Sequence, residues 1–275
     1  MEKILLINDI DHIKNYIDKY SMDHILSGQI NKFESHSKFN LISFDWYDIN
    51  DTKAGPSQII IHFSQKNLFF ICEDERSLNI VNKLLKKDDC IEKMLYNFFA
   101  DIINQDTDFL EALEEEITET EDDLLCSSKK EYAGIIISYR RKLLKLKKYY
   151  EQLNSIFEGF VQNENKLISE DNSIYFNILD NRIDRLFYNV LNIRDYVTQV
   201  REAYQAQIDI DQNNIMRVFT VITSIFLPLT LIVGWYGMNV QMPESSWKYG
   251  YPFVIVLSLI VSSICLIIFK RKKWF

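Results

Sequence analysis

Hydrophobic residues change their spacing along the chain, and the first 88 residues show the spacing of short strands and helices. Two apolar runs at residues 58–64 and 67–72, QIIIHFS and NLFFIC, are separated by two polar residues and predict a β-hairpin. Residues 40–49 also alternate, and residues 75–87 carry apolar positions at helical spacing. We therefore predict a mixed α/β domain over residues 1–88.

The next part of the chain has the period of amphipathic helices. Apolar residues recur every three or four positions over residues 90–126, and again over 129–161 after a break at two serines. The first of these helices is acidic on its exposed face and the second is basic, which predicts an antiparallel hairpin over residues 89–165 with opposite charges facing. The acidic stretch 110–123 is either a solvated face or an attractor of divalent cations, and spacing does not separate the two.

The most regular pattern of the polar part is a heptad seam. Its apolar positions alternate spacings of four and three, which predicts packing against sister or neighbouring helices: Leu179, Ile183, Leu186, Val190, Ile193, Val197, Val200 and Tyr204. No proline or glycine separates this seam from a charge-free run that begins at Val218. We predict one helix from about Ser173 to Tyr236, with a stalk over 172–217 and a membrane span over 218–239.

Two charge-free runs near the C-terminus, the first span and residues 249–269, are each long enough to cross a hydrocarbon core of about 30 Å. Arg217 precedes the pair and the basic tail 270–275 follows it, whereas the connecting loop 240–248 has one basic and one acidic residue. The positive-inside rule then predicts that both termini lie in the cytoplasm. We expect the protein to lie in the cytoplasmic membrane of a bacterium. The N-terminus has no signal-peptide pattern.

Composition excludes several functions. The formal net charge is −8, from 39 acidic and 31 basic residues, which argues against nucleic acid as a partner. With seven glycines and no phosphate-binding loop, nucleotide binding is not expected. The four cysteines and four histidines are scattered without metal-ligand spacing, so we interpret the histidines as surface or packed residues. No catalytic constellation appears, and the chain is not expected to be an enzyme.

The first span carries small and polar residues on one helical face. They step by three or four positions: Asn213, Met216, Thr220, Thr223, Leu227, Thr230 and Gly234. Two spans cannot enclose a hydrophilic path, so this face favours several copies around an axis, although each threonine hydroxyl can also bond to its own backbone. At the end of the face Asn239 supplies a neutral oxygen. A ring of such amides could hold a hydrated Mg²⁺ through its waters.

The residues around this end resemble the CorA family of Mg²⁺ channels, the two-span GMN transporters. The motif Tyr236-Gly237-Met238-Asn239 is followed by Met242-Pro243-Glu244 and preceded by MRVFT at 216–220 and FLPLT at 226–230. The specific match covers about residues 200–275. The upstream part is similar in architecture only and is shorter than is usual in the family.

The resemblance implies a pentameric funnel of identical chains in membrane lipid, with the first span lining the pore. Gly237, Met238 and Asn239 would form the selectivity filter, and Met216 and Phe219 a hydrophobic constriction, although the family commonly has a leucine-like residue where Phe219 stands. Further rings would be supplied by Thr230 at mid-pore, Asn213 at the cytoplasmic mouth and Glu202 at the entrance.

The resemblance also implies that Mg²⁺ is both the transported ion and a regulator, with no other cofactor. Asp180 and Asp184 are candidate regulatory ligands, and a solvated helix face is the alternative for them. Because the sequence has no ATP site, we predict passive, gated Mg²⁺ influx driven by the membrane potential. Two alternatives stay open: a Zn²⁺, Co²⁺ or Ni²⁺ transporter of the same family, against which the lack of pore His or Cys argues, and a membrane-anchored scaffold or sensor without transport.

Overall fold

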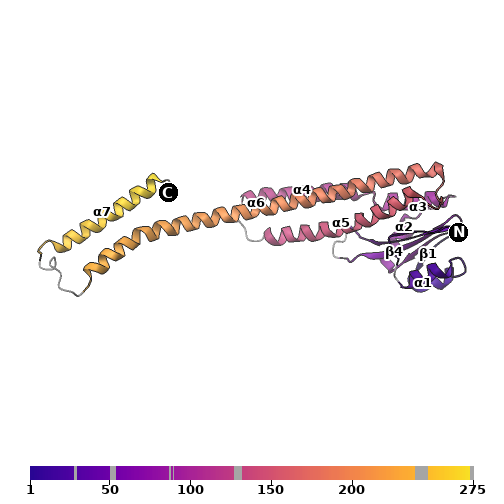
Figure 1. The fold of residues 1–275 in the computed structure, drawn as a ribbon, viewed down its shortest axis with the longest axis horizontal. Coiled ribbons are helices and arrows are strands. Elements are labelled where there is room, and N and C mark those ends of the chain that lie inside the picture. Colours follow the sequence, from indigo (N-terminus) through magenta and orange to yellow (C-terminus); the bar gives the residue numbers. More distant parts are fainter. Residues whose placement is uncertain are drawn as a thin grey trace. The chain divides into compact units, whose positions relative to one another are not determined.

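The computed structural model describes residues 1–27, 30–49, 54–86, 88, 90–126, 132–238 and 247–272 (Figure 1). The chain forms two compact units, Met1–Arg201 and Glu202–Phe275, and the boundary between them falls inside one long helix. The fold class predicted from the sequence is confirmed: an N-terminal α/β part is followed by long helices, the last two of which are apolar enough to span a membrane.

A five-stranded sheet forms the centre of the first unit. Its strands stand in the order β1-β5-β4-β3-β2, with β1 parallel to β5 and the other neighbours antiparallel. The strands are β1 Glu2–Leu6, β2 Phe33–Ser35, β3 Phe39–Trp46, β4 Ser57–Ser64 and β5 Leu68–Cys72. The predicted hairpin is confirmed as β4 and β5, in which Ile61 stands opposite Phe70.

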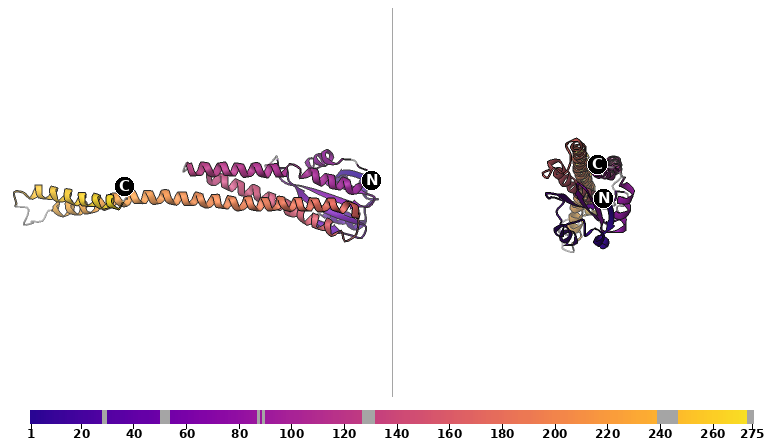
Figure 2. Two further views of the ribbon diagram at one scale, coloured as in Figure 1. Left: turned by 90° about the horizontal axis from the view of Figure 1, so that it is seen from above. Right: turned by 90° about the vertical axis from the view of Figure 1, so that its right-hand side faces the viewer.

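Helices cover both faces of the sheet (Figures 1 and 2). On one face lie the 3-10 helix η1 Ile7–Ile13 and α1 Lys19–Ser27, neither of which the sequence pattern predicted; Ile13 and Ile25 pack there against Ile60 and Phe69. On the other face the core is aromatic. The Phe70 ring lies 4.8 Å from the Phe98 ring, centroid to centroid. Alternation along β5 therefore sends successive side chains into two different cores.

The elements on the aromatic side are α2 Glu75–Leu84, α3 Ile91–Ile102, α4 Asp106–Cys126 and α5 Tyr132–Gln162. The expectation of one helix over residues 90–126 is wrong, because the chain leaves the helical ladder at Ile103 and starts again at Asp106. Arg182 donates from Nη2 to the carbonyls of Ile103 and Asn104, at 3.2 Å each, and so supplies donors to carbonyls at the break. The position predicted for the start of α5, Lys129, lies outside the described residues.

Helices α4 and α5 are antiparallel, as their contacts show. Tyr150 in the second half of α5 reaches Asp106 at the start of α4, while Tyr139 in the first half of α5 shares a hydrogen bond with Thr120 near the end of α4, at 2.9 Å. Lys142 lies over the Phe109 ring, 4.8 Å from its centroid. Aromatic and hydroxyl contacts therefore join the two helices of this hairpin, and the pairing of their opposite charges stays a prediction.

The longest element, α6, runs from Glu170 to Tyr236 and confirms the predicted continuous helix. The heptad seam from Leu179 to Val200 is buried, and Tyr204, one step further, is half-buried. Tyr196 beside this seam donates to the Glu121 carboxylate of α4. The predicted helix-on-helix packing is thus made along its buried length by helices of the same chain (Figure 2).

Asp106 is a buried carboxyl, 2 % exposed, that accepts a hydrogen bond from the Tyr150 hydroxyl at 2.8 Å. Burial raises its pKa from 3.8 to about 6, although the Tyr150 hydrogen bond and the charge of Arg182 oppose the rise. The folded state therefore holds this proton more tightly than the unfolded chain does. Stability from this group is greatest below pH 4 and falls as the pH rises through 6.

Asp106→Asn should remove that fall, since an amide has no proton to lose. The free energy of unfolding of the variant, relative to the natural protein, is expected to rise between pH 4 and pH 6 by up to ~3 kcal/mol and then level off. Denaturant titrations at several pH values measure it. Asp108→Asn, which changes an exposed carboxylate on the same turn, is the matched control, and equal pH profiles for the two variants would contradict the account.

Two glycines of α5 test how closely this helix packs against its neighbours. A Cβ at Gly159 would overlap the Phe33 ring, which is itself packed edge-on against Phe160 at 5.1 Å, whereas a Cβ at Gly134 would meet nothing within 4 Å. Gly159→Ala should destabilise the fold by ~1–3 kcal/mol through overpacking, and Gly134→Ala should stabilise it by ~0.5–1 kcal/mol through helix propensity. Unfolding midpoints measure both, and the same sign for both variants would show that Phe33 is not confined by α5.

Candidate functional site

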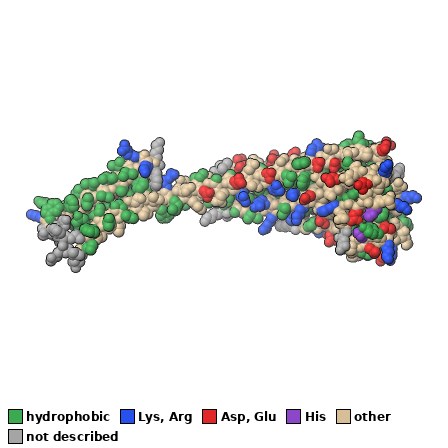
Figure 3. Space-filling model, viewed as in Figure 1, with side chains coloured by type: hydrophobic (Ala, Val, Ile, Leu, Met, Phe, Trp, Pro, Cys, Tyr) green, Lys and Arg blue, Asp and Glu red, His purple; other side chains and the backbone are tan. Residues whose placement is uncertain are grey.

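The second unit consists of the end of α6 and helix α7, Gly250–Arg271. Each is long and apolar enough to cross a membrane. Hydrophobic side chains dominate this part of the surface in Figure 3. Because no water hydrates backbone groups in a bilayer core, a helix is a suitable form for both segments.

One face of α6 packs against α7. Val221 is 3 % exposed, and Ser224, Pro228 and Ile232 at the following turns are half-buried. Serines and other small or medium side chains of α7 are half-buried in return, among them Ser258 and Ser262. Small residues on both helices permit this approach.

The predicted pore-lining residues lie on another face of α6, away from these contacts. All are exposed in the single chain: Asn213, Met216, Phe219, Thr220, Thr223, Leu227, Thr230 and Gly234. With 3.6 residues per turn they form a stripe on the side of α6 roughly opposite Val221 and Pro228. We call these eight residues the α6 stripe. Glu202 is also exposed, at the start of the second unit.

The threonine hydroxyls of the α6 stripe bond to their own helix. Thr220, Thr223 and Thr230 each donate to the carbonyl four residues earlier, at 2.8 Å in every case. Each threonine O–H donor is therefore satisfied within the helix, as expected if these hydroxyls bond to their own backbone. Each hydroxyl oxygen still has acceptor capacity, so the stripe can accept hydrogen bonds from water.

Glycines at the end of α6 meet two different environments. A Cβ at Gly234 would meet nothing within 4 Å, so no described part of this chain requires a glycine there. A Cβ at Gly237 would lie 2.8 Å from the Val233 carbonyl oxygen, which accepts the Gly237 N–H at 2.8 Å. Gly237 is thus required by the way α6 ends. Met238 follows and is exposed, while the predicted filter residue Asn239 lies outside the described residues.

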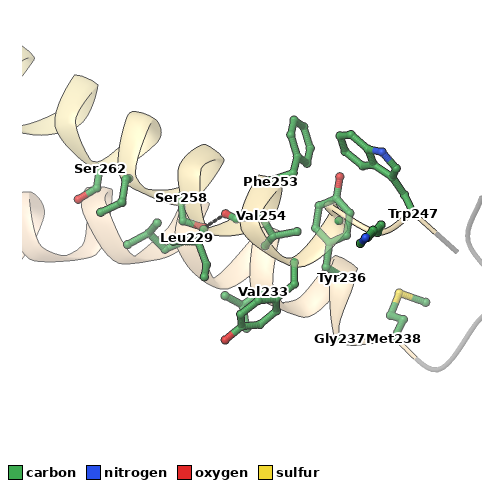
Figure 4. Close-up of a pocket in the computed structure, with 15 residues that line it drawn as sticks. Leu229, Val233, Tyr236, Gly237, Met238, Trp247, Phe253, Val254, Ser258 and Ser262 are labelled. Carbon is green, nitrogen blue, oxygen red and sulfur yellow. Dashed lines mark hydrogen bonds between the residues drawn. The ribbon is translucent and has the colours of Figure 1, made fainter. Parts of the chain in front are cut away.

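A groove of about 840 Å³ opens between α6 and α7 beside Gly237 (Figure 4). Aromatic side chains gather at this end, and the Trp247 ring lies 5.8 Å from the Phe253 ring, centroid to centroid. Tyr236 lines the same groove. Aromatic residues of this kind are enriched where a helix leaves the hydrocarbon core.

Pro228 breaks the backbone ladder of α6, and α7 supplies a replacement donor. Proline has no N–H, so the Ser224 carbonyl, four residues earlier, lacks its usual partner. The Cys265 thiol of α7 approaches that oxygen to 3.9 Å. Sequence reasoning treated Cys265 as an isolated thiol; the position of Pro228 was the available signal, but pairing it with a residue 41 positions away required the structure.

The candidate regulatory residues Asp180 and Asp184 lie one turn apart on α6, in the first unit. The pKa of Asp180 is raised, first by partial burial and then by the carboxylates of Asp184 and of Glu158 on α5. Asn154 of α5 donates to Asp184 at 3.1 Å. The structure therefore brings these carboxylates together, but among the described residues no group of acidic, His or Cys side chains forms a set that could hold a metal ion.

The fold and the two apolar helices define a two-span membrane protein with an N-terminal α/β unit. The family described as CorA-like Mg²⁺ transporter protein matches residues 15–271, and the chain belongs to this family. Cobalt/magnesium transport protein CorA of Thermotoga maritima is 30% identical over 182 residues, which are 66% of this chain and 52% of the relative. The chain thus spans about half the length of that relative.

Two solved structures share the fold. The complete structure of the CorA magnesium transporter from Methanocaldococcus jannaschii superposes with a TM-score of 0.78 at 20% identity, covering 98% of this chain and 87% of the other. The full-length CmaX protein gives a TM-score of 0.75 at 16% identity, covering 99% and 88%. At these identities the likeness establishes the fold alone, whereas the family match over residues 15–271 confirms the resemblance noted in the sequence.

The thiol of Cys265 and the ring of Pro228 should be energetically coupled. Cys265→Ala is expected to destabilise the second unit by ~0.5–1.5 kcal/mol, because the Ser224 carbonyl loses its donor. In a Pro228→Ala background the alanine N–H takes that carbonyl, and Cys265→Ala should then have less effect. A double-mutant cycle on thermal unfolding in detergent measures the coupling. Strict additivity of the two substitutions would contradict the contact.

Proposed function

We propose that this chain transports divalent cations, Mg²⁺ foremost, across the cell membrane as a channel built from several copies. Membership of a family described by Mg²⁺ transport supports the proposal, as does a relative named for cobalt and magnesium transport. The observation that carries it is the α6 stripe, which presents amide and hydroxyl oxygens and a glycine that no described side chain packs against, and which faces away from α7.

The proposed assembly is a homopentamer in which α6 lines the pore. A lone chain would place the outward oxygens of Thr220, Thr223 and Thr230 against lipid, whereas an assembly places them against water. Gly234 then permits close approach of a neighbouring copy, the usual role of a small residue in a membrane helix. Closed rotational symmetry satisfies every copy equally.

In this assembly Asn239, with Gly237 and Met238, forms the outer selectivity ring. A neutral amide oxygen binds the waters of a hydrated Mg²⁺ rather than stripping them, which keeps binding weak enough for release. Met216 and Phe219 close the path by dewetting, and Asn213 and Glu202 form rings on the cytoplasmic side. Both termini lie in the cytoplasm, where Asp180 and Asp184 serve as candidate ligands for regulatory Mg²⁺.

Transport in this proposal is passive. A potential of 100 mV acts on a divalent ion with ~4.6 kcal/mol, twice the value for one elementary charge. No hydrolysis step is needed, and no resident cofactor takes part. A Zn²⁺, Co²⁺ or Ni²⁺ transporter is the alternative within the family, and a scaffold without transport is the alternative outside it.

Uptake into proteoliposomes with an imposed inside-negative potential tests the proposal. We expect the natural protein to take up Mg²⁺. The Mg²⁺ uptake rate of Asn239→Ala should be at least tenfold lower. Asn177→Ala is the matched control, because Asn177 is exposed on α6 in the first unit and its side-chain amide donates to the Ser173 carbonyl of its own helix. Parallel assays with Zn²⁺, Co²⁺ and Ni²⁺ separate the family alternatives.

Each result of this assay has one interpretation. Equal rates for the natural protein and Asn239→Ala would remove Asn239 from the filter. Preferred uptake of Zn²⁺, Co²⁺ or Ni²⁺ over Mg²⁺ would select the alternative within the family. No uptake of any divalent ion by the natural protein would favour the scaffold.

A further inference from the structure

A cavity of about 560 Å³ in the first unit is lined by the end of β3 and by helix α5. Asp45 lines it from the end of β3, Tyr47 follows that strand, and Lys32 lies just before β2. Most of the remaining lining comes from α5, over residues 145–155. Small-molecule sites are commonly cavities of roughly 300–1,000 Å³. None of these residues belongs to the proposed ion path.

The basic side chains of α5 are divided between two surroundings. Lys142 lies over an aromatic ring of α4, whereas Lys145 lies over the Tyr47 ring, 5.6 Å from its centroid. Lys145 and Lys148 line the cavity, together with Lys32. Part of the positive charge of α5 therefore borders the end of β3 rather than α4, and the predicted charge pairing of α4 with α5 does not account for it.

A buried glutamine joins the two walls of the cavity. Gln152 is 7 % exposed; its Oε1 accepts the Asp45 N–H at 3.0 Å, and its Nε2 donates to the Lys148 carbonyl at 3.1 Å. These bonds hold α5 against the end of β3, so the walls are in place before a ligand arrives, which lowers the entropy cost of binding. The same amide nitrogen carries a second N–H beside the cavity.

Tyr149 lines the cavity with a hydroxyl that lacks a partner. It is 2 % exposed, and within the described ranges of the chain its hydroxyl makes no hydrogen bond. Burial, and then the charge of Asp106, raises the pKa of Tyr149 well above its usual value of 10, so the phenol stays neutral and remains a donor. A buried hydroxyl without a partner destabilises a fold, and an acceptor inside the cavity would remove that cost.

Two exposed carboxylates, those of Asp45 and Glu151, also line the cavity. Glu151 Oε2 lies 3.7 Å from Nζ of Lys147, one turn earlier on α5, so part of its charge is already offset. Three lysines against two carboxylates leave the described lining positive. Because a carboxylate only accepts hydrogen bonds, these two side chains suit hydroxyl groups of a ligand and not its anionic part.

We propose that this cavity binds a sugar phosphate, a small ligand with one phosphate monoester and several hydroxyl groups. The phosphate carries roughly two negative charges and three acceptor oxygens near neutral pH. It pairs with the lysine ammonium groups and accepts a hydrogen bond from the Tyr149 hydroxyl. The sugar hydroxyls donate to Asp45 and Glu151.

Both halves of such a ligand are needed to match the lining. Inorganic phosphate would pair with the lysines but would face the carboxylates of Asp45 and Glu151 as a like charge. A neutral sugar would satisfy those carboxylates and leave the lysines without a counter-charge. Lysine suits the phosphate half, because its ammonium group sits on a long flexible stem and can close on a ligand from two elements, the segment before β2 and α5.

Calorimetric titration of the full chain in detergent at pH 7.5, without Mg²⁺, tests the proposal with ribose 5-phosphate and glucose 6-phosphate as probes. We expect at least one probe to bind at least tenfold more tightly than inorganic phosphate, ribose or glucose. Lys145→Gln, Lys148→Gln and Tyr149→Phe should each weaken that binding at least fivefold. Lys142→Gln and Tyr139→Phe are the matched controls, because both residues lie on α5 but contact α4, and both variants should bind as the natural protein does.

The unfolding temperature of ligand-free Tyr149→Phe provides a second readout. It should equal or exceed that of the natural protein, because phenylalanine fills the same space without a buried hydroxyl that lacks a partner. A lower unfolding temperature would show that the hydroxyl already has a partner, such as a buried water, and would overturn the assignment of Tyr149 as a donor to the ligand.

The outcomes of the titration are decisive in both directions. Binding of neither sugar phosphate overturns the proposal, as does binding that survives in all three cavity variants or falls equally in Lys142→Gln. Equal affinity for inorganic phosphate would also overturn it, since the site would then select only charge. Circular dichroism of each variant confirms that it is folded. Transport is not measured, so failure here is independent of the proposed channel.

Discussion

A backbone carbonyl inside a bilayer has no water to accept from, and this constraint determines how α6 and α7 must pair. Pro228 removes one donor from α6, and the Cys265 thiol reaches the oxygen that is left, at 3.9 Å. The point where α6 is interrupted is therefore also a point where α7 is needed. Val221, which is 3 % exposed and so the most buried described residue of the second unit, lies on the same side of the helix.

Fixing one face of α6 against α7 leaves the opposite face uncovered. Thr220, Thr223 and Thr230 have satisfied their donors within the helix, yet their oxygens point outward together with Gly234. A glycine lowers helix stability by about 1 kcal/mol relative to alanine, and among the described residues no side chain packs against the Gly234 position in return. An exposed glycine on this face supports the proposal of several copies, in which a neighbouring chain would cover it.

Periodicity predicted much of the fold because it reflects local burial. The β4–β5 hairpin, the core face of α5 and the heptad seam from Leu179 to Val200 all follow from spacing alone. The break between α3 and α4 did not, because it depends on Arg182, which is 79 residues from Ile103 in the sequence. The short β2 and α1 were missed as well, since neither is long enough to show a clear period.

Some features of the candidate site could also be predicted from the sequence, and others required the structure. The Gly-Met-Asn motif and the polar stripe are readable in the sequence, since residues three or four apart share a helix face. The contact between the Cys265 thiol and the Ser224 carbonyl is not readable in this way, because helix pairing brings together two residues that are 41 positions apart.

The chemistry that the α6 stripe would offer a cation in the proposed channel follows from the hydration of the ion. An ion held through its waters is sensed by size and charge, because its own preference for nitrogen or oxygen never reaches the protein. Amide and hydroxyl oxygens on α6 can therefore separate divalent from monovalent ions more readily than Mg²⁺ from Zn²⁺. Ligand preference is read only where an ion loses its water to ligands such as imidazole nitrogens or thiolates, and the α6 stripe presents neither.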